Sequence, residues 1–114
     1  MRIGIVGAGR IALQTLKAAT RRGISQTAVA NRTLERAVEA AAPFGAATHT
    51  LDDLAATLAW ADLAVTATSS ETPVVSAETV AAAMAGREDR LLVLVDLAVP
   101  ADVERSAGEV PGVR

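Results

Sequence analysis

The first twelve residues of the chain constrain its fold more than any other stretch. Residues 3–6, Ile-Gly-Ile-Val, form the short apolar run that a strand buried on both faces requires. The turn Gly7-Ala8-Gly9 ends this run, and an amphipathic helical pattern starts directly after it. Strand, glycine turn and helix in this order, with Ala12 as the third small residue, match the G-x-G-x-x-G/A fingerprint of a dinucleotide-binding fold.

Each small residue of this turn has its own physical task. Gly7 permits a tight turn, Gly9 lets the backbone approach a pyrophosphate, and Ala12 lets the helix pack closely against the sheet. The unpaired N–H groups at the helix start, with the helix dipole behind them, would hold the phosphates. The alternative is a turn that only joins a strand to a helix. The predicted contacts with the dinucleotide are Gly7, Ala8, Gly9, Arg10 and Ile11.

A second informative stretch, Asn31-Arg32-Thr33, follows a second buried strand at residues 27–30. In domains that prefer NAD, an acidic residue about 20 residues past the glycines binds the ribose 2′-hydroxyl. This stretch has no carboxylate, and the guanidinium of Arg32 suits a 2′-phosphate that an acid would repel. Thr33 can donate its hydroxyl to the same phosphate, and Arg36 adds charge one turn later. The pattern predicts NADPH/NADP over NAD; the alternative makes Thr33 only a helix cap and both arginines solvated.

Two further loops follow strands that we predict at residues 63–67 and 91–95. In an open parallel sheet, ligands bind beyond the carboxyl ends of the strands, near the point where the strand order reverses. The hydroxyl-rich loop Thr68-Ser69-Ser70 should therefore face the ribose and nicotinamide half of the cofactor, unless it is a plain polar turn. Asp96, at the end of the fifth strand, either caps backbone groups or contacts the ligand, and Ala98 is a predicted contact beside it.

The remaining polar residues do not indicate catalysis. His49 is the only histidine, and we expect it to be solvated in a loop. Asp52 and Asp53 complement the dipole of a helix that starts near them, which explains them better than paired acid chemistry. The mixed-charge run at residues 87–90 reads as a solvated connection. We predict no catalytic residue and no metal ligand in this chain.

The order of the patterns predicts an α/β fold. A helical pattern follows each of the first four predicted strands, at residues 3–6, 27–30, 46–48 and 63–67, of which the third is short. Ser76 should cap the last of these helices. We expect a Rossmann-type, doubly wound parallel sheet of about five strands, in the order 3-2-1-4-5, with helices on both faces in three layers. A short helix should run through Arg105, and residues 110–114 should approach a sixth strand that the chain lacks.

Composition limits the classes of partner. The 114 residues predict one domain over 1–114, and the net charge of −2 gives no reason to expect nucleic acid or an anionic membrane as a partner. The chain has no cysteine, which excludes disulfides, cysteine-ligated metals and a cysteine nucleophile within it. No apolar run approaches the roughly 18 residues of a membrane helix, so a cytoplasmic location is the default expectation.

Several segments together resemble glutamyl-tRNA reductase, in the same order and at similar spacing. The resemblance covers nearly the whole chain but only the NADPH-binding domain of that enzyme. The Asn-Arg-Thr turn is shared with shikimate dehydrogenases, whereas the segment from Asp96 to Pro100, followed by Asp102, is more specific. The segments are Gly7-Ala8-Gly9, residues 31–37, Thr68-Ser69-Ser70 with Pro73-Val74-Val75, residues 96–100 and Pro111-Gly112-Val113.

The resemblance implies a reaction and a set of partners. The family captures glutamate from its tRNA as a cysteine thioester and reduces it with NADPH to glutamate-1-semialdehyde, for tetrapyrrole synthesis. The cysteine belongs to an N-terminal domain and homodimerisation to a C-terminal helical domain of the full-length enzyme, and neither is present here. We therefore expect an excised domain that binds NADPH, meets glutamyl-tRNA only through the missing domains, and does not turn over the substrate alone.

Two other functions are compatible with parts of the sequence. The same turns would serve the cofactor domain of a shikimate-dehydrogenase-like reductase, although the run from Asp96 to Pro100 is not expected there. A stand-alone NADPH-sensing module is a third interpretation. The missing sixth strand argues against it, because the last strand would be an exposed edge that pairs with other chains.

Overall fold

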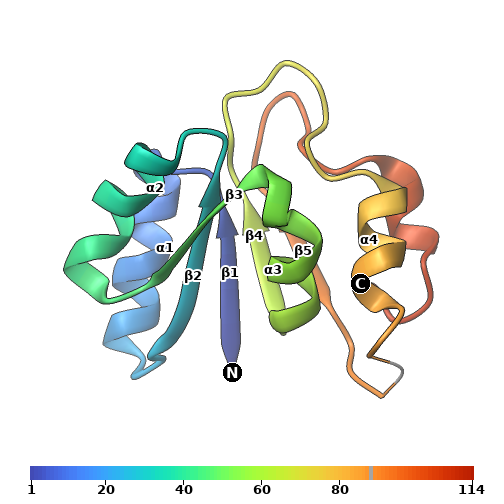
Figure 1. Cartoon of the computed structure of the whole chain (residues 1–114), viewed down its shortest axis with the longest axis horizontal. Coiled ribbons are helices and arrows are strands. Elements are labelled where there is room, and N and C mark those ends of the chain that lie inside the picture. The colour runs from blue at the N-terminus through green and yellow to red at the C-terminus, as the bar shows by residue number, and fades with distance from the viewer. Residues whose placement is uncertain (88) are drawn as a thin grey trace.

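The fold is a parallel sheet of five strands in the order β3-β2-β1-β4-β5, which confirms the predicted topology. The computed structural model describes residues 1–87 and 89–114. In Figure 1 the sheet separates α1 and α2 on one side from α3 and α4 on the other. The strands are β1 (Arg2–Val6), β2 (Gln26–Asn31), β3 (Ala47–Thr50), β4 (Leu63–Thr66) and β5 (Val93–Asp96).

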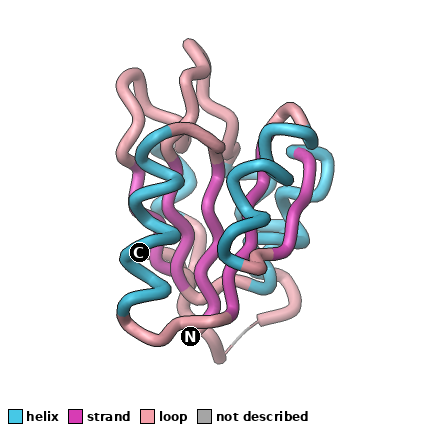
Figure 2. Tube along the Cα trace, turned by 90° about the vertical axis from the view of Figure 1, so that its left-hand side faces the viewer, coloured by secondary structure: helices cyan, strands magenta, loops and turns pink. Residues whose placement is uncertain are grey.

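The connections between the strands are helical. Each α-helix crosses from the carboxyl end of one strand to the start of the next, and Figure 2 shows the strands lying between the helices. Short 3₁₀ segments follow α2, precede α3 and lie near the C-terminus. The α-helices are α1 (Arg10–Arg21), α2 (Leu34–Ala41), α3 (Leu54–Trp60) and α4 (Ala77–Met84), and the 3₁₀ segments are η1 (Ala42–Phe44), η2 (Leu51–Asp53) and η3 (Arg105–Glu109).

Two cores lie on opposite faces of the sheet because successive strand side chains point to opposite faces. Ile5 packs with Leu16 in the core beneath α1 and α2. Its neighbour Val6 packs instead with Leu58 and Val80 in the core beneath α3 and α4. All five side chains are fully buried, and each contributes about 1.5–3 kcal/mol to folding by leaving water.

The ends of several elements match their sequence signals. Gly23 adopts a left-handed φ of +75° just after α1, as expected for a residue that ends a helix. The Ser76 hydroxyl accepts a hydrogen bond from the Thr79 N–H at 3.0 Å, which confirms its predicted role as the cap of α4. Within residues 1–87 and 89–114, no helix combines the length and the apolar character needed to cross a membrane.

Three local predictions were wrong. His49 lies in β3 and pairs with Ala30 of β2, because β3 extends two residues beyond the predicted strand. The fifth strand begins at Val93 rather than at residue 91. Arg87 is only 5% exposed, since its guanidinium satisfies backbone carbonyls at the end of α3, so it is not part of a solvated run. Glu88, also in that run, lies outside the described residues.

The last residues of the chain pair along the open edge of β5. Val113 forms a parallel bridge with Leu92. The Arg114 N–H donates to the Leu92 carbonyl at 2.8 Å, and the Leu94 N–H donates to the Arg114 carbonyl at 2.7 Å. The predicted approach to a sixth strand is therefore present, and these residues already occupy the position of that strand beside β5.

Candidate cofactor-binding site

Two adjoining pockets open at the carboxyl edge of the sheet and together form one cleft. They share the side chains of Asn31, Arg36, Thr68 and Ser69. The first pocket, of about 390 Å³, lies against the glycine turn and is also lined by Ala8, Gly9, Arg10, Ile11 and Ala67. The second, of about 350 Å³, lies beyond β2 and is also lined by Arg32, Thr33, Leu51, Ser70, Thr72 and Val74.

Gly7 forms the floor of the turn and does not line the cleft. Its φ of +123° lies in the region that glycine tolerates and side chains avoid. A Cβ at this position would lie 2.6 Å from the carbonyl oxygen of Ala67, the residue just after β4. Its N–H donates to the Ala30 carbonyl at 2.8 Å. The chain itself therefore requires glycine here, and the fold depends on it directly.

Gly9 differs, because nothing in the chain requires a glycine at this position. Its φ of −91° is open to any residue, and no atom lies within 4 Å of the place where a Cβ would stand. Gly9 caps α1 without a side-chain hydrogen bond, and the first turn contains Arg10 but no acidic residue. A cation at a helix N-terminus opposes the helix dipole unless an anion lies nearby. Open space, free helix N–H groups and a positive side chain together fit a diphosphate.

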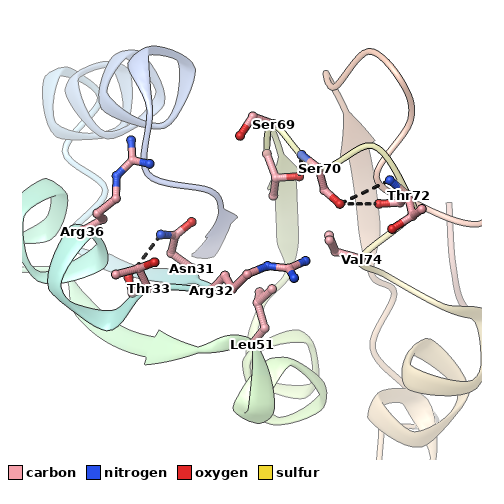
Figure 3. A pocket seen from close by; sticks show the side chains of 10 residues that line it. Asn31, Arg32, Thr33, Arg36, Leu51, Ser69, Ser70, Thr72 and Val74 are labelled. Atoms are coloured by element: carbon pink, nitrogen blue, oxygen red, sulfur yellow. Dashed lines mark hydrogen bonds between the residues drawn. The ribbon is translucent and has the colours of Figure 1, made fainter.

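The tip of β2 supplies the charge of the second pocket. The Asn31 side chain donates to the Thr33 carbonyl at 3.1 Å and so shapes the turn into α2. Thr33 is the N-cap of α2, but its hydroxyl makes no capping hydrogen bond and is available to a ligand. Figure 3 shows the Arg32 side chain extending across the pocket above Leu51, whereas Arg36 points toward the glycine turn. The two guanidinium groups therefore lie in different parts of the cleft.

The loop after β4 contributes hydroxyl groups, but they do not have the same surroundings. The N–H of Thr68 donates to Oδ2 of Asp102 at 2.7 Å, and its hydroxyl forms a short hydrogen bond with Oδ1 of the same carboxylate. The Ser70 hydroxyl donates to the Thr72 carbonyl at 2.7 Å. Ser69 is exposed, and its hydroxyl points into the cleft (Figure 3). Ser69 is thus the best-placed hydroxyl of this loop for a ligand.

Asp96 and Ala98 lie outside the cleft. The carboxylate of Asp96 accepts hydrogen bonds from the Thr66 hydroxyl at 3.1 Å and from the Ala98 N–H at 3.1 Å. It also accepts the N–H groups of Asp102 and Val103, each at 2.9 Å. These four bonds support the capping alternative for Asp96. Direct contact of Asp96 or Ala98 with a ligand stays a prediction.

The protonation of Asp96 should make stability depend on pH. Burial raises the pKa of its carboxyl, but the hydrogen bonds from Val103, Ala98, Asp102 and Thr66 outweigh burial, and the net pKa is lowered. A lowered folded-state pKa stabilises the fold fully above the unfolded value of about 3.9, and this contribution is lost as the pH falls through the folded-state pKa. Asp96→Asn should therefore lower the free energy of unfolding by about 2–3 kcal/mol at neutral pH, and this deficit should shrink as the pH falls below about 3.9.

Urea denaturation of both proteins at pH 7, 5 and 3 measures this difference. An Asp96→Asn deficit that stays the same at all three values would show that the charge of the carboxylate is not what stabilises the loop. A variant that is as stable as the parent at pH 7 would contradict the role of Asp96 as a cap.

Sequence reasoning did not identify four residues that line the cleft. Leu51 directly follows the carboxyl end of β3, and that position was a usable signal, because ligands gather at the carboxyl ends of parallel strands. Val74 and Thr72 come from an irregular segment without periodicity, so no local pattern could place them. Ala67 directly follows β4 and carries only a methyl group. The four residues are Leu51, Ala67, Thr72 and Val74.

Sheet order, glycine turn and cleft define a Rossmann-like NAD(P)-binding domain. A sequence model of the family "Shikimate / quinate 5-dehydrogenase" matches residues 1–114, and the chain belongs to this family. It is also homologous to the cofactor domain of glutamyl-tRNA reductase. The enzyme of that name from Rhodopirellula baltica is 40% identical over 112 residues, which are 98% of this chain and 26% of the relative.

Solved structures agree with this relationship. The glutamyl-tRNA reductase from Methanopyrus kandleri matches with a TM-score of 0.92 and 34% identity, over 99% of this chain and 29% of that one. The nucleotide-binding domain of the enzyme from Thermoplasma volcanium matches with a TM-score of 0.62 and 23% identity, over 98% of this chain and 72% of that one, which shows the shared fold. The chain spans about a quarter of the length of the relatives that resemble it in sequence.

Proposed function

We propose that this chain is the NADPH-binding domain of an oxidoreductase similar to glutamyl-tRNA reductase. In that role it supplies the hydride that reduces a glutamyl thioester to glutamate-1-semialdehyde for tetrapyrrole synthesis. The observation that carries the proposal is the cleft itself. It connects the open space above Gly9 to a strand tip that carries Arg32 and no carboxylate.

Different residues of the cleft bind different parts of the cofactor in this proposal. The N–H groups at the start of α1 hold the diphosphate, with Arg10 and Arg36 adding positive charge. Arg32 and the Thr33 hydroxyl bind the 2′-phosphate, and Ser69 faces the remainder of the cofactor. NADPH, when bound, supplies the hydride. The chain has no cysteine, so the thiolate that accepts the glutamyl group comes from another domain in this proposal.

Discrimination between NADPH and NADH tests the role of Arg32. Loss of a charge-assisted hydrogen bond costs about 1.5–3 kcal/mol, so Arg32→Ala should weaken NADPH binding by roughly 10- to 100-fold and leave NADH binding nearly unchanged. Titration of cofactor fluorescence measures both affinities. Arg22→Ala is the matched control, because Arg22 is exposed at the far end of α1. Equal affinity of the parent for both cofactors would contradict the proposal.

The cofactor domain of a shikimate-dehydrogenase-like reductase is a second candidate, since the matching family model carries that name. NADPH binding does not separate the two candidates, because both use the same turns. Sequencing the surrounding open reading frame does. A cysteine-bearing domain encoded upstream supports the first candidate, and a catalytic lysine–aspartate pair supports the second.

A further inference from the structure

Asp102 is an acidic residue with no exposed surface, and it lies outside the cleft. A buried carboxylate is costly unless donors surround it. The donors here come from Thr68, 34 positions earlier in the chain, whose N–H and hydroxyl each bond to a separate carboxylate oxygen. The fold therefore uses a buried acidic side chain to hold Thr68, in the loop that follows β4.

Thr68 links Asp102 to the rest of that loop through a further hydrogen bond. Because the Thr68 hydroxyl donates its hydrogen bond to Asp102, its oxygen is left to accept one, and the Ser70 N–H donates to it at 3.2 Å. Ser70 in turn holds Thr72 through paired hydrogen bonds, the second of them from the Thr72 N–H to the Ser70 oxygen at 3.3 Å. The residues on either side of Ser69, Thr68 and Ser70, are thereby hydrogen-bonded within the fold, while the Ser69 hydroxyl faces the cleft (Figure 3).

Asp102 is itself fixed from two other segments. Its N–H donates to Asp96, and its carbonyl accepts the N–H groups of Val74 at 2.8 Å and Val75 at 2.9 Å. The adjacent residues Val75 and Val103 form a parallel bridge. In Figure 1 the two loops beyond β4 and β5 run side by side at the top of the molecule, which is where these bonds join them. Backbone hydrogen bonds to both neighbouring segments therefore hold the anchor of the cleft loop in place.

We propose that Asp102 is a positioning residue for cofactor binding, acting through Thr68 to hold Ser69 at the cleft. This inference rests on the proposed function. Without the anchor the loop samples many conformations in the free protein, and ordering it at the moment of binding reduces affinity. It follows that Thr68 makes no donor contact with the cofactor, because both of its donors are committed to Asp102.

Affinity, measured in protein that is fully folded, tests the proposal. The amide of an Asp102→Asn variant has one acceptor for two donors, and Thr68→Val removes the hydroxyl but keeps the side-chain shape. Each should raise the dissociation constant of NADPH about tenfold at a temperature far below its unfolding midpoint, and the double variant should be no worse than either. Thr68→Ser should recover most of the affinity that Thr68→Val loses. Asp89→Asn, at an exposed site, is the matched control.

Amide hydrogen exchange of the free protein provides a readout that does not need the cofactor. In Asp102→Asn, exchange at Thr68 and Ser70 should become at least about tenfold faster, while the amides of β1 keep their protection. Unchanged exchange at both positions would overturn the proposal. So would lower thermal stability with unchanged NADPH affinity, which is the behaviour of a merely structural residue. If the parent protein binds no NADPH, the proposed function fails, and exchange alone then decides whether Asp102 anchors the loop.

Discussion

An alanine at position 7 should lower the free energy of unfolding by about 3–5 kcal/mol, which is a large part of the roughly 5–15 kcal/mol that stabilises a typical domain. Two effects add. The backbone of Gly7 has a φ of +123°, and a Cβ there would lie 2.6 Å from the Ala67 carbonyl oxygen. The position of a Cβ is fixed by the backbone of residue 7, and the Ala67 oxygen belongs to the backbone, so the contact cannot be relieved by turning a side chain.

The matched experiment is Gly9→Ala, two residues along the same turn. Its methyl group meets no atom of the chain within 4 Å, so stability should change by no more than about 1 kcal/mol, the cost of an alanine N-cap. The methyl group would nevertheless stand where the diphosphate is proposed to lie, and NADPH binding should weaken by at least roughly tenfold. Urea denaturation and cofactor titration of both variants separate these effects.

The two outcomes test different claims. If Gly7→Ala unfolded at the same urea concentration as the parent, the geometry of the turn between β1 and α1 would be wrong. If Gly9→Ala bound NADPH as tightly as the parent, the diphosphate would not lie at the start of α1. If Gly9→Ala weakens NADPH binding but keeps its stability, while Gly7→Ala loses stability, then Gly7 serves folding and Gly9 serves binding within one turn.

The sheet order could be predicted because its signals are local. Apolar runs such as residues 3–6, glycine turns and helical periodicity alternate along the chain, and parallel strands joined by helices admit few topologies. The ends of elements were less predictable, because pairing between strands decides them. His49 has no local strand signal and joins β3 through its pairing with Ala30. Leu92 was predicted in the fifth strand but precedes β5 and forms an isolated bridge with Val113.

The residues of the cleft and its supports likewise differ in whether a local sequence signal marks them. Gly9, Asn31 and Ser69 line the cleft and were predicted because each lies at a helix start, at a strand end or in the loop beyond a strand, positions that converge on one edge of the sheet. Asp96 was predicted as a possible cap from its place at a strand end, and three of its four donors lie within seven residues of it. Asp102 carries no local signal for its role, because Thr68 is 34 positions away. Which donors a carboxylate meets depends on how the loops beyond β4 and β5 pack together, 30 or more residues apart in sequence. Tertiary packing, and no pattern along the chain, makes Asp102 an anchor.

Arg87 is the residue whose environment differs most from the sequence-based expectation. It stands in a mixed-charge run that is typical of solvated loops, yet its guanidinium lies at the C-terminal end of α3. It donates to the carbonyls of Leu58 at 2.7 Å and Ala59 at 3.0 Å, and also to that of Ala61. A further bond, to the Leu91 carbonyl at 2.6 Å, ties the helix to the segment that leads into β5. The last carbonyls of a helix have no intrahelical donors, and a cation suits the negative end of its dipole.

Arg87→Met should therefore lower the free energy of unfolding by about 3–5 kcal/mol, because methionine keeps the packing but leaves buried carbonyls without donors. Arg90→Met is the matched control from the same run. The Arg90–Asp62 ion pair, 2.9 Å long, joins side chains that are 41% and 38% exposed, and such a surface pair contributes about 1 kcal/mol or less. Urea denaturation of the two variants gives the comparison. Equal losses would mean that Arg87 acts as a surface charge, and a larger loss for Arg87→Met would identify it as the residue that joins the end of α3 to the start of β5.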